Sequence, residues 1–172
     1  MTPQNRRKSV PPGPARGLDM VIRHARKEDV DAISDLIVRT KRLNNEFDPL
    51  FAVTPDAKGR AEKYVQATLA APGNLLLVAL EGRKVVGVLR AEMRERIFYE
   101  PRNEGRVTDF YILPEHRRKA LGDEMIQQAA AELKSMGAEI VVADVPAQNE
   151  IANRFYIKRG FRALINQFAK RP

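Results

Sequence analysis

The chain has 172 residues, 44% of them hydrophobic, and carries a formal net charge of +8. This length and this apolar share are typical of one globular domain with its own core. Cysteine is absent, which excludes disulfides and thiolate metal sites and fits a reducing cytoplasm. The sequence contains only two histidines, His24 and His116, so no metal site is expected.

The excess of positive charge favours anionic partners, such as nucleotides and phosphorylated cofactors. A solvated, salt-bridged surface is the alternative interpretation for most of this charge, since 30% of the residues are charged. No run of about 18 apolar residues occurs, so neither a transmembrane helix nor membrane association is expected.

Residues 1–17 are rich in proline and glycine and include the basic run Arg6-Arg7-Lys8. This composition is typical of a flexible tail outside any core, so we expect one domain over residues 18–172. The tail could contact nucleic acid or an acidic partner, but a leader without a role is the simpler interpretation.

The first half of that domain predicts a strand, two helices and a hairpin. Apolar residues recur at helical spacing after the first strand, with acids in the first turn and cations in the last. Thr54 and Pro55 have the residue types of an N-cap and a first helical position. The expected order is strand 20–24, helix 27–44, loop 44–49, helix 55–71, strand 75–80 and strand 85–93, which can extend to residue 99.

Strands and helices alternate in the second half. The expected elements are strand 106–113, a helix between Gly122 and Gly137, strand 139–145, helix 150–158 and a final strand 161–168. The whole order is β-α-α-β-β-β-α-β-α-β. This is an α/β (α+β) arrangement in which hairpins precede a right-handed strand–helix–strand crossover.

The stretch from Asp109 to Gly122 joins a strand to a helix through a basic turn. Pro114 ends the strand because it has no backbone N–H. Three adjacent cations follow it: Arg117, Arg118 and Lys119. The first turn of a helix offers unpaired N–H groups and the positive end of the helix dipole. The stretch therefore predicts a site for a phosphate or pyrophosphate.

Two local motifs, together with this order of elements, resemble the GNAT family, the Gcn5-related N-acetyltransferases that use acetyl-CoA. The first motif is Arg117-Arg118-Lys119-Ala120-Leu121-Gly122, similar to the family's Arg/Gln-x-x-Gly-x-Gly/Ala, with Ala120 in place of the first glycine. The second motif is Asn149-Glu150-x-Ala152-x-x-Phe155-Tyr156-x-Lys158-Arg159-Gly160-Phe161. The resemblance covers residues 21–168 and implies the GNAT fold, a mixed, mostly antiparallel sheet of six to seven strands with about four helices.

For the cofactor, the resemblance implies acetyl-CoA bound along the first motif and the strand before it. The backbone of Phe110, Tyr111 and Ile112 is expected to hydrogen-bond the pantetheine arm as an added strand. Asn149 is expected near the same arm, although asparagine is also a good helix N-cap. The turn and the first amides of the helix are expected to hold the pyrophosphate. The residues implied there are Arg117, Arg118, Lys119, Ala120, Leu121, Gly122 and Asp123.

For catalysis, Tyr156 resembles the family's general acid, which gives a proton to the departing CoA thiolate and also contacts the cofactor. Packing beside Phe155 is its alternative role. A backbone amide near Ile112 is the implied donor to the carbonyl oxygen that gains charge. Relatives such as the polyamine acetyltransferases place a glutamate base where this chain has Thr108. Asp109 and Glu46 are the candidates for the base, with Asp48, Glu92 or a water chain as alternatives, and each of these acids also has a plausible structural role.

The sequence therefore predicts an acetyl-CoA-dependent N-acetyltransferase that acts on a primary amine. The amine could belong to a protein N-terminus, a lysine, a polyamine or another small molecule, and the loop 44–49 is expected to shape its site. A homodimer is implied only by the resemblance to this family, and nucleic acid is not an expected partner of the enzyme. The alternative function is a catalytically weak module with the same fold that binds nucleic acid or protein.

Overall fold

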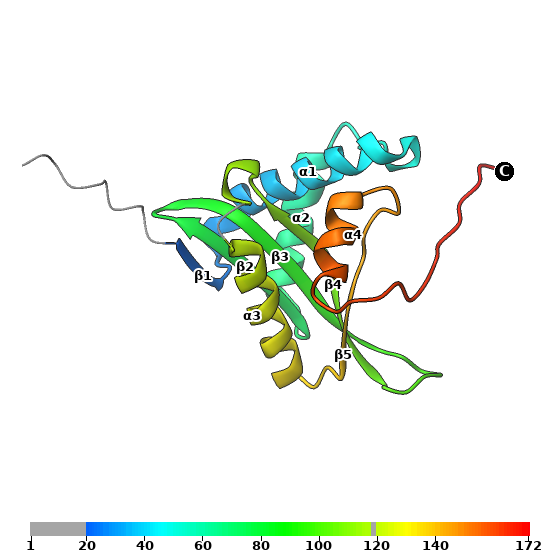
Figure 1. Ribbon diagram of the computed structural model, residues 1–172. Helices are drawn as coiled ribbons and strands as arrows, with labels where there is room; N and C mark the ends of the chain where they lie inside the picture. Colours follow the sequence, from blue (N-terminus) through cyan, green and yellow to red (C-terminus); the bar gives the residue numbers. More distant parts are fainter. Residues whose placement is uncertain (1–19, 118–119) are drawn as a thin grey trace, which may run out of the picture.

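The structure, a computed structural model, describes residues 20–117 and 120–172 (Figure 1). Its centre is a five-stranded sheet with the spatial order β1-β2-β3-β4-β5. The strands are Met20–His24 (β1), Asn74–Glu81 (β2), Lys84–Glu95 (β3), Asn103–Ile112 (β4) and Ile140–Ala143 (β5). Strands β1 to β4 pair in antiparallel fashion, whereas β5 runs parallel to β4.

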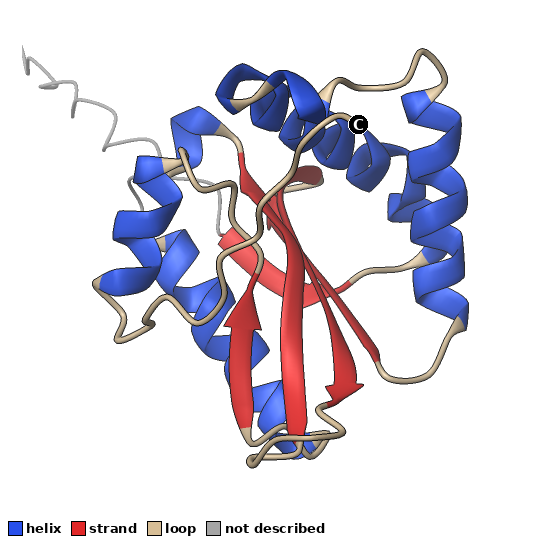
Figure 2. Cartoon of the chain, turned by 90° about the vertical axis from the view of Figure 1, so that its right-hand side faces the viewer, coloured by secondary structure: helices blue, strands red, loops and turns tan. Residues whose placement is uncertain are grey.

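Helices cover both faces of this sheet (Figure 2). Helices α1 (Val30–Phe47) and α2 (Ala57–Ala70) pack together on one face, and α3 (Leu121–Ser135) packs against β2, β3 and β4 on the other face. Helix α4 (Glu150–Ile157) lies beside the end of β4. Three 3-10 turns complete the described elements: η1 (Lys27–Asp29), η2 (Pro49–Phe51) and η3 (Pro114–His116). Within the described residues, no helix is long and apolar enough to cross a membrane.

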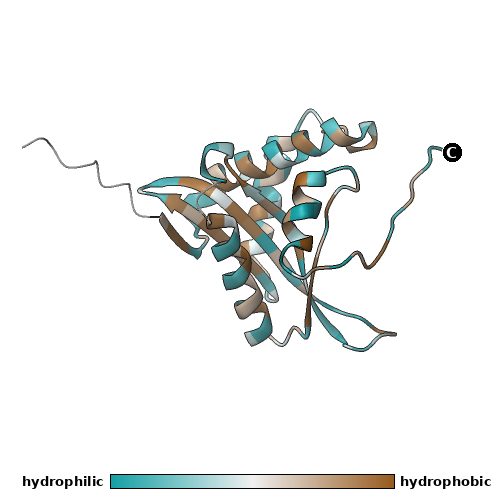
Figure 3. Ribbon diagram, in the orientation of Figure 1, coloured by the Kyte–Doolittle hydropathy of each residue, from teal (hydrophilic) through white to brown (hydrophobic). Residues whose placement is uncertain are grey.

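The core forms where the apolar strands meet the helices, and the strands are largely brown in Figure 3. Every residue of β2 from Leu75 to Leu80 is buried, as its continuous apolar run predicts. Glycine lets α3 approach the sheet closely. A Cβ on Gly105 would lie 2.8 Å from Leu133 Cδ1, closer than van der Waals contact allows. Gly105 therefore fixes the distance between β4 and α3.

Several expected boundaries differ from the structure. Helix α1 extends to Phe47, so Glu46 lies in its last turn and not in a loop. Helix α2 begins at Ala57 with Asp56 as its N-cap, so Thr54 is not its N-cap. The sheet has five strands instead of six to seven, because the expected strand 161–168 does not form.

The segment after α4 fails as a strand for a physical reason. Phe161 packs edge-on against the Tyr156 ring, with 5.1 Å between centroids, but the chain then leaves the sheet. The segment forms no ladder with β5, the edge strand of the sheet, and its apolar residues Leu164, Ile165 and Phe168 are exposed, so they are not packed against the sheet. The alternation of residues therefore indicated a strand without indicating a partner for it.

The sheet opens between its last two strands. Strand β5 pairs with β4 only from Glu104 to Val107, whereas β4 continues to Ile112. On the other side of β4, Asp109 opposes Arg90 and Val107 opposes Ala91, so Thr108 is the extra residue of a β-bulge. Beyond the bulge, one edge of β4 has no neighbouring strand in the described part of the chain.

Candidate active site

The unpaired edge of β4 presents backbone groups at two residues. The N–H of Leu113 donates to the carbonyl of Val86 on β3 (2.9 Å). Because backbone groups alternate in an antiparallel ladder, the N–H and C=O groups of Phe110 and Ile112 point away from β3, and those of Tyr111 point toward it. Phe110 and Ile112 therefore direct their backbone groups to the open edge of β4, while the backbone of Tyr111 belongs to the ladder with β3.

The basic turn follows this edge directly. Arg117 Nε donates to the carbonyl of Ile112 (2.9 Å), and its guanidinium lies 5.3 Å from the centre of the Tyr111 ring. Arg118 and Lys119 lie outside the described residues. Ala120 precedes α3 with a φ of +56°, a left-handed conformation that favours glycine. Ala120 therefore adopts a left-handed conformation at the position where the similar family motif has glycine.

The two sequence motifs meet at the start of α3. A Cβ on Gly122 would lie 3.0 Å from the Phe155 ring, so Gly122 lets α4 approach. Asp123 forms an ion pair with Arg159, whose guanidinium stacks 3.5 Å from the centre of the Phe155 ring. The first turn of α3 is thus held against α4, next to the free edge of β4. Sequence reasoning gave Arg159 no role, although its place beside Gly160 in the second motif was a signal.

Tyr156 lies on α4 with only 8% of its surface exposed, between the rings of Phe155 and Phe161. Burial, followed by the negative charge of Asp144, raises the pKa of Tyr156 above its ordinary value. Its hydroxyl makes no hydrogen bond with the described residues. A neutral phenol in this environment can donate a proton to a bound group, and its ring also serves the packing of α4.

Asn149 is the N-cap of α4, since its Oδ1 accepts a hydrogen bond from the N–H of Ala152 (3.1 Å). The capping role considered from the sequence is therefore present. Its side-chain Nδ2 makes no hydrogen bond within the described part of the chain, so the same residue can still donate to a ligand.

Asp109 lies in a buried polar network under α1 and α2, and 3% of its surface is exposed. Its carboxylate accepts hydrogen bonds from Lys41 Nζ (2.5 Å) and from the Tyr64 hydroxyl (2.8 Å). Thr108 adds a third hydrogen bond at 3.1 Å. Burial and the charge of Asp109 raise the pKa of Tyr64. Asp109 is therefore a carboxylate that is already well satisfied.

Arg90 forms the other half of this network. It donates to Thr68 (2.9 Å), to Thr108 (2.7 Å) and to Glu92 (2.8 Å), and its guanidinium lies 4.5 Å from the centre of the Tyr64 ring. Glu92 also binds Arg94. The structural role considered for Glu92 from the sequence, pairing with Arg90 or Arg94, is therefore present. Sequence reasoning missed the other partners of the network, Lys41 and Tyr64. A single arginine inside the apolar run 85–93 was the available signal, because a buried charge needs partners.

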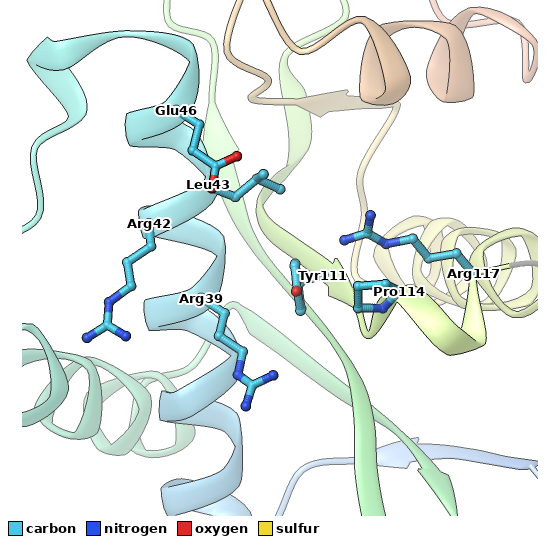
Figure 4. Close-up of a pocket in the computed structure, with 7 residues that line it drawn as sticks. All are labelled: Arg39, Arg42, Leu43, Glu46, Tyr111, Pro114 and Arg117. Carbon is cyan, nitrogen blue, oxygen red and sulfur yellow. The ribbon is translucent and has the colours of Figure 1, made fainter.

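A groove opens on the same side of β4, between α1 and the basic turn (Figure 4). Its volume is about 430 Å³. Its lining residues are Arg39, Arg42, Leu43 and Glu46 from α1, Tyr111 from β4, and Pro114 and Arg117 after it. Within the described residues, Glu46 makes no ion pair or hydrogen bond. By contrast, Asp48 accepts from the Leu50 N–H (2.8 Å) in a turn. Of the acids considered as a base, only Glu46 lines this groove.

Comparisons with known proteins identify relatives over most of the chain. The chain is 26% identical to an aminoalkylphosphonate N-acetyltransferase of Salmonella typhimurium over 149 residues, which cover 87% of this chain and 89% of that protein. It is 27% identical to an L-amino acid N-acyltransferase of Escherichia coli over 146 residues, which cover 83% and 79%.

A solved structure of a predicted acetyltransferase with acetyl-CoA, from Clostridium acetobutylicum, superposes with a TM-score of 0.73 at 15% identity. The match covers 89% of this chain and 96% of that one, and at this identity it shows the fold. A model of the acetyltransferase (GNAT) family matches residues 30–161. The chain therefore belongs to the acetyltransferase (GNAT) family and is an N-acetyltransferase.

Proposed function

We propose that this enzyme transfers the acetyl group of acetyl-CoA to the primary amine of a small molecule, by direct attack of the amine on the thioester. The observation that carries the proposal is the continuity of three features. The free edge of β4 at Phe110 and Ile112 leads into the basic turn, and the turn leads to the start of α3, against which α4 holds Tyr156.

The residues along this path fit acetyl-CoA. The backbone groups of Phe110 and the N–H of Ile112 have no partner in the described residues and match an amide-bearing chain, which would pair with them as an added strand, while the Ile112 carbonyl accepts from Arg117. The first amides of α3 suit a pyrophosphate, which helix N-termini bind, and the sequence prediction adds the cations Arg118 and Lys119. When bound, acetyl-CoA supplies an activated acyl thioester.

Tyr156 is proposed to donate its proton to the sulfur that leaves. The backbone N–H of Ile112, on the free edge, is proposed to donate to the carbonyl oxygen as that oxygen gains negative charge. Both donors belong to rigid elements. Neither donor is a charged side chain, so neither places an additional charge in the site.

The base is proposed to be Glu46, which takes the proton of the incoming ammonium directly or through water. Its carboxylate has no partner in the described residues and faces the groove (Figure 4). Asp109 is the second candidate. Its bonds to Lys41 and Tyr64 would have to weaken before it could accept a proton.

A small acceptor is supported by the relatives, both of which are named for small amine-bearing molecules. The test has two parts. Saturating CoA should raise the melting temperature, because a ligand that binds only the folded state stabilises it. Acetyl transfer to small amines should then be detected by mass spectrometry. Absence of stabilisation by CoA would overturn the proposal, whereas binding without transfer to any amine would favour a non-catalytic module.

A further inference from the structure

We propose that the groove between α1 and the end of β4 binds an acidic group of the acceptor, so that the acceptor is an amine that also carries a carboxylate, phosphonate or phosphate. This inference rests on the proposed acetyl transfer and narrows its substrate. Arg39, Arg42 and Arg117 are the residues proposed to hold the acidic group.

The arginines that line the groove differ from most other arginines of the described chain in having no ion pair. Most arginines of the described chain form an ion pair with an aspartate or glutamate: Arg23, Arg26, Arg60, Arg90, Arg94, Arg96, Arg102, Arg106, Arg154 and Arg159. Arg39, Arg42 and Arg117 form none with any described residue, yet all three line the same groove. Arg83, Arg162 and Arg171 also form no ion pair with a described residue, but they do not line the groove. Three unpaired guanidinium groups at one place indicate a ligand that supplies the missing negative charge.

The three arginines come from both walls of the groove. Arg39 and Arg42 are three residues apart, so they lie on one face of α1. Arg117 lies on the other wall of the groove, with its guanidinium directed toward α1 (Figure 4). Its Nε is fixed by the carbonyl of Ile112, which leaves its terminal nitrogens free to bind. A guanidinium binds a carboxylate or phosphonate through two parallel N–H donors, so this arrangement favours an oxyanion over any other anion.

Glu46 is the one acid among the described residues that line the groove. Glu46 lies four residues after Arg42, about 6 Å further along the helix axis. A carboxylate beside unpaired guanidinium groups matches a short zwitterion, with its ammonium at Glu46 and its acidic group at the arginines. A polyamine has no group for the arginines, so the groove disfavours it.

The groove also differs from the path proposed for acetyl-CoA. Residues alternate between the faces of a strand. The Asp109 side chain contacts α1 and α2, and Tyr111 shares its face. The Phe110 ring instead packs against Phe155 of α4, 5.6 Å between centroids. The groove therefore lies on the α1 face of β4, and Arg117 is the described residue of the basic turn that lines it.

The experiment compares matched amines that differ in the acidic group: β-alanine with propylamine, and 2-aminoethylphosphonate with ethanolamine. The acidic member of at least one pair should be acetylated with a roughly tenfold or greater advantage in kcat/KM. The carboxylate and phosphonate pairs show which oxyanion the groove prefers. Equal or better use of the neutral amines would overturn the inference while leaving the acetyltransferase proposal intact.

The matched variants are Arg39→Gln with Arg42→Gln, and Arg60→Gln as a control at an exposed position on α2. The double variant should raise KM for the acidic amine roughly tenfold and leave KM for acetyl-CoA unchanged. It should also abolish the rise in melting temperature that the acidic amine causes in the presence of CoA, which is a readout independent of turnover. A raised KM for acetyl-CoA, with KM for the amine unchanged, would assign the arginines to the cofactor's phosphates and overturn the inference.

Discussion

Two clusters of charge lie side by side on the α1 face of the sheet, and they differ in how their charges are satisfied. In the buried network, Arg90, Glu92, Lys41 and Asp109 are bonded to one another or to hydroxyl groups. In the neighbouring groove, Arg39, Arg42, Arg117 and Glu46 form no ion pair with the described residues. The comparison teaches that charge paired inside the fold supports structure, whereas exposed, unpaired charge on rigid elements is free for a ligand.

The largest effect on stability is expected in the network. Arg90→Met should lower the free energy of unfolding by about 3 kcal/mol, because it removes one partner of a buried ion pair and leaves Glu92, Thr68 and Thr108 short of a donor. Urea unfolding measures the change. Arg94→Met removes the exposed partner of the same glutamate and should cost less than about 1 kcal/mol. Equal costs would erase the distinction between the buried and exposed partners.

The next effect concerns the base. Glu46→Gln should lower kcat by about 100-fold and leave the urea midpoint unchanged, because Glu46 is exposed and unpaired. Asp109→Asn should instead lower the free energy of unfolding by about 2 kcal/mol, because Lys41 and Tyr64 lose a charged acceptor. Steady-state kinetics and unfolding are measured on both variants. A larger loss of kcat in a folded Asp109→Asn enzyme would move the base into the network.

A smaller effect is expected at the turn that leads from β4 into α3. Ala120→Gly should raise the free energy of unfolding by about 0.5–1 kcal/mol, because glycine adopts the left-handed φ of +56° without the steric cost that alanine bears. Ala67→Gly, at an exposed position inside α2, should have the opposite sign and cost about 1 kcal/mol. Thermal unfolding compares the two, and destabilisation by both would contradict the left-handed turn.

The smallest effect is a dependence on pH. Burial alone would raise the pKa of Glu92, but hydrogen bonds from Arg90 and Arg94 bring it below its ordinary value. Because the folded pKa is the lower one, the stabilisation is present above the unfolded value of about 4.3 and is lost as the pH falls through the folded value. Between about pH 5 and pH 3, Glu92→Gln should therefore lose less stability than the wild type. Parallel pH profiles would show that Glu92 does not contribute.

Much of the fold was predictable because local patterns determined it. The apolar run of β2, the alternation in β4 and the helical spacing in α1 gave elements at the right places. The expected strand 161–168 was wrong, because a strand needs a partner that no local pattern reveals. The family assignment from the two motifs was confirmed. Their meeting at Gly122 and Phe155 explains why motifs about 30 residues apart belong together.

The site was predictable only in part. Candidates that depend on the backbone, such as Phe110 and Ile112, follow from strand position and stay predictions for cofactor binding. Arg39 and Arg42 were noticed only as cations at the end of a helix. Their proposed role rests on the groove and on the ion pairs of most other arginines, which are properties of the folded chain. Lys41 was missed as a partner of Asp109 for the same reason, since 68 residues separate the two.

The most direct test of the account is acetyl transfer measured by mass spectrometry, with acetyl-CoA and each of the four matched amines, for the wild type and Tyr156→Phe. The account predicts acetylated product from an acidic amine with the wild type, and a rate lower by about 100-fold for Tyr156→Phe at an unchanged affinity for CoA. Transfer by Tyr156→Phe at the wild-type rate would contradict the mechanism, and the absence of product from all four amines would contradict the proposed acceptor.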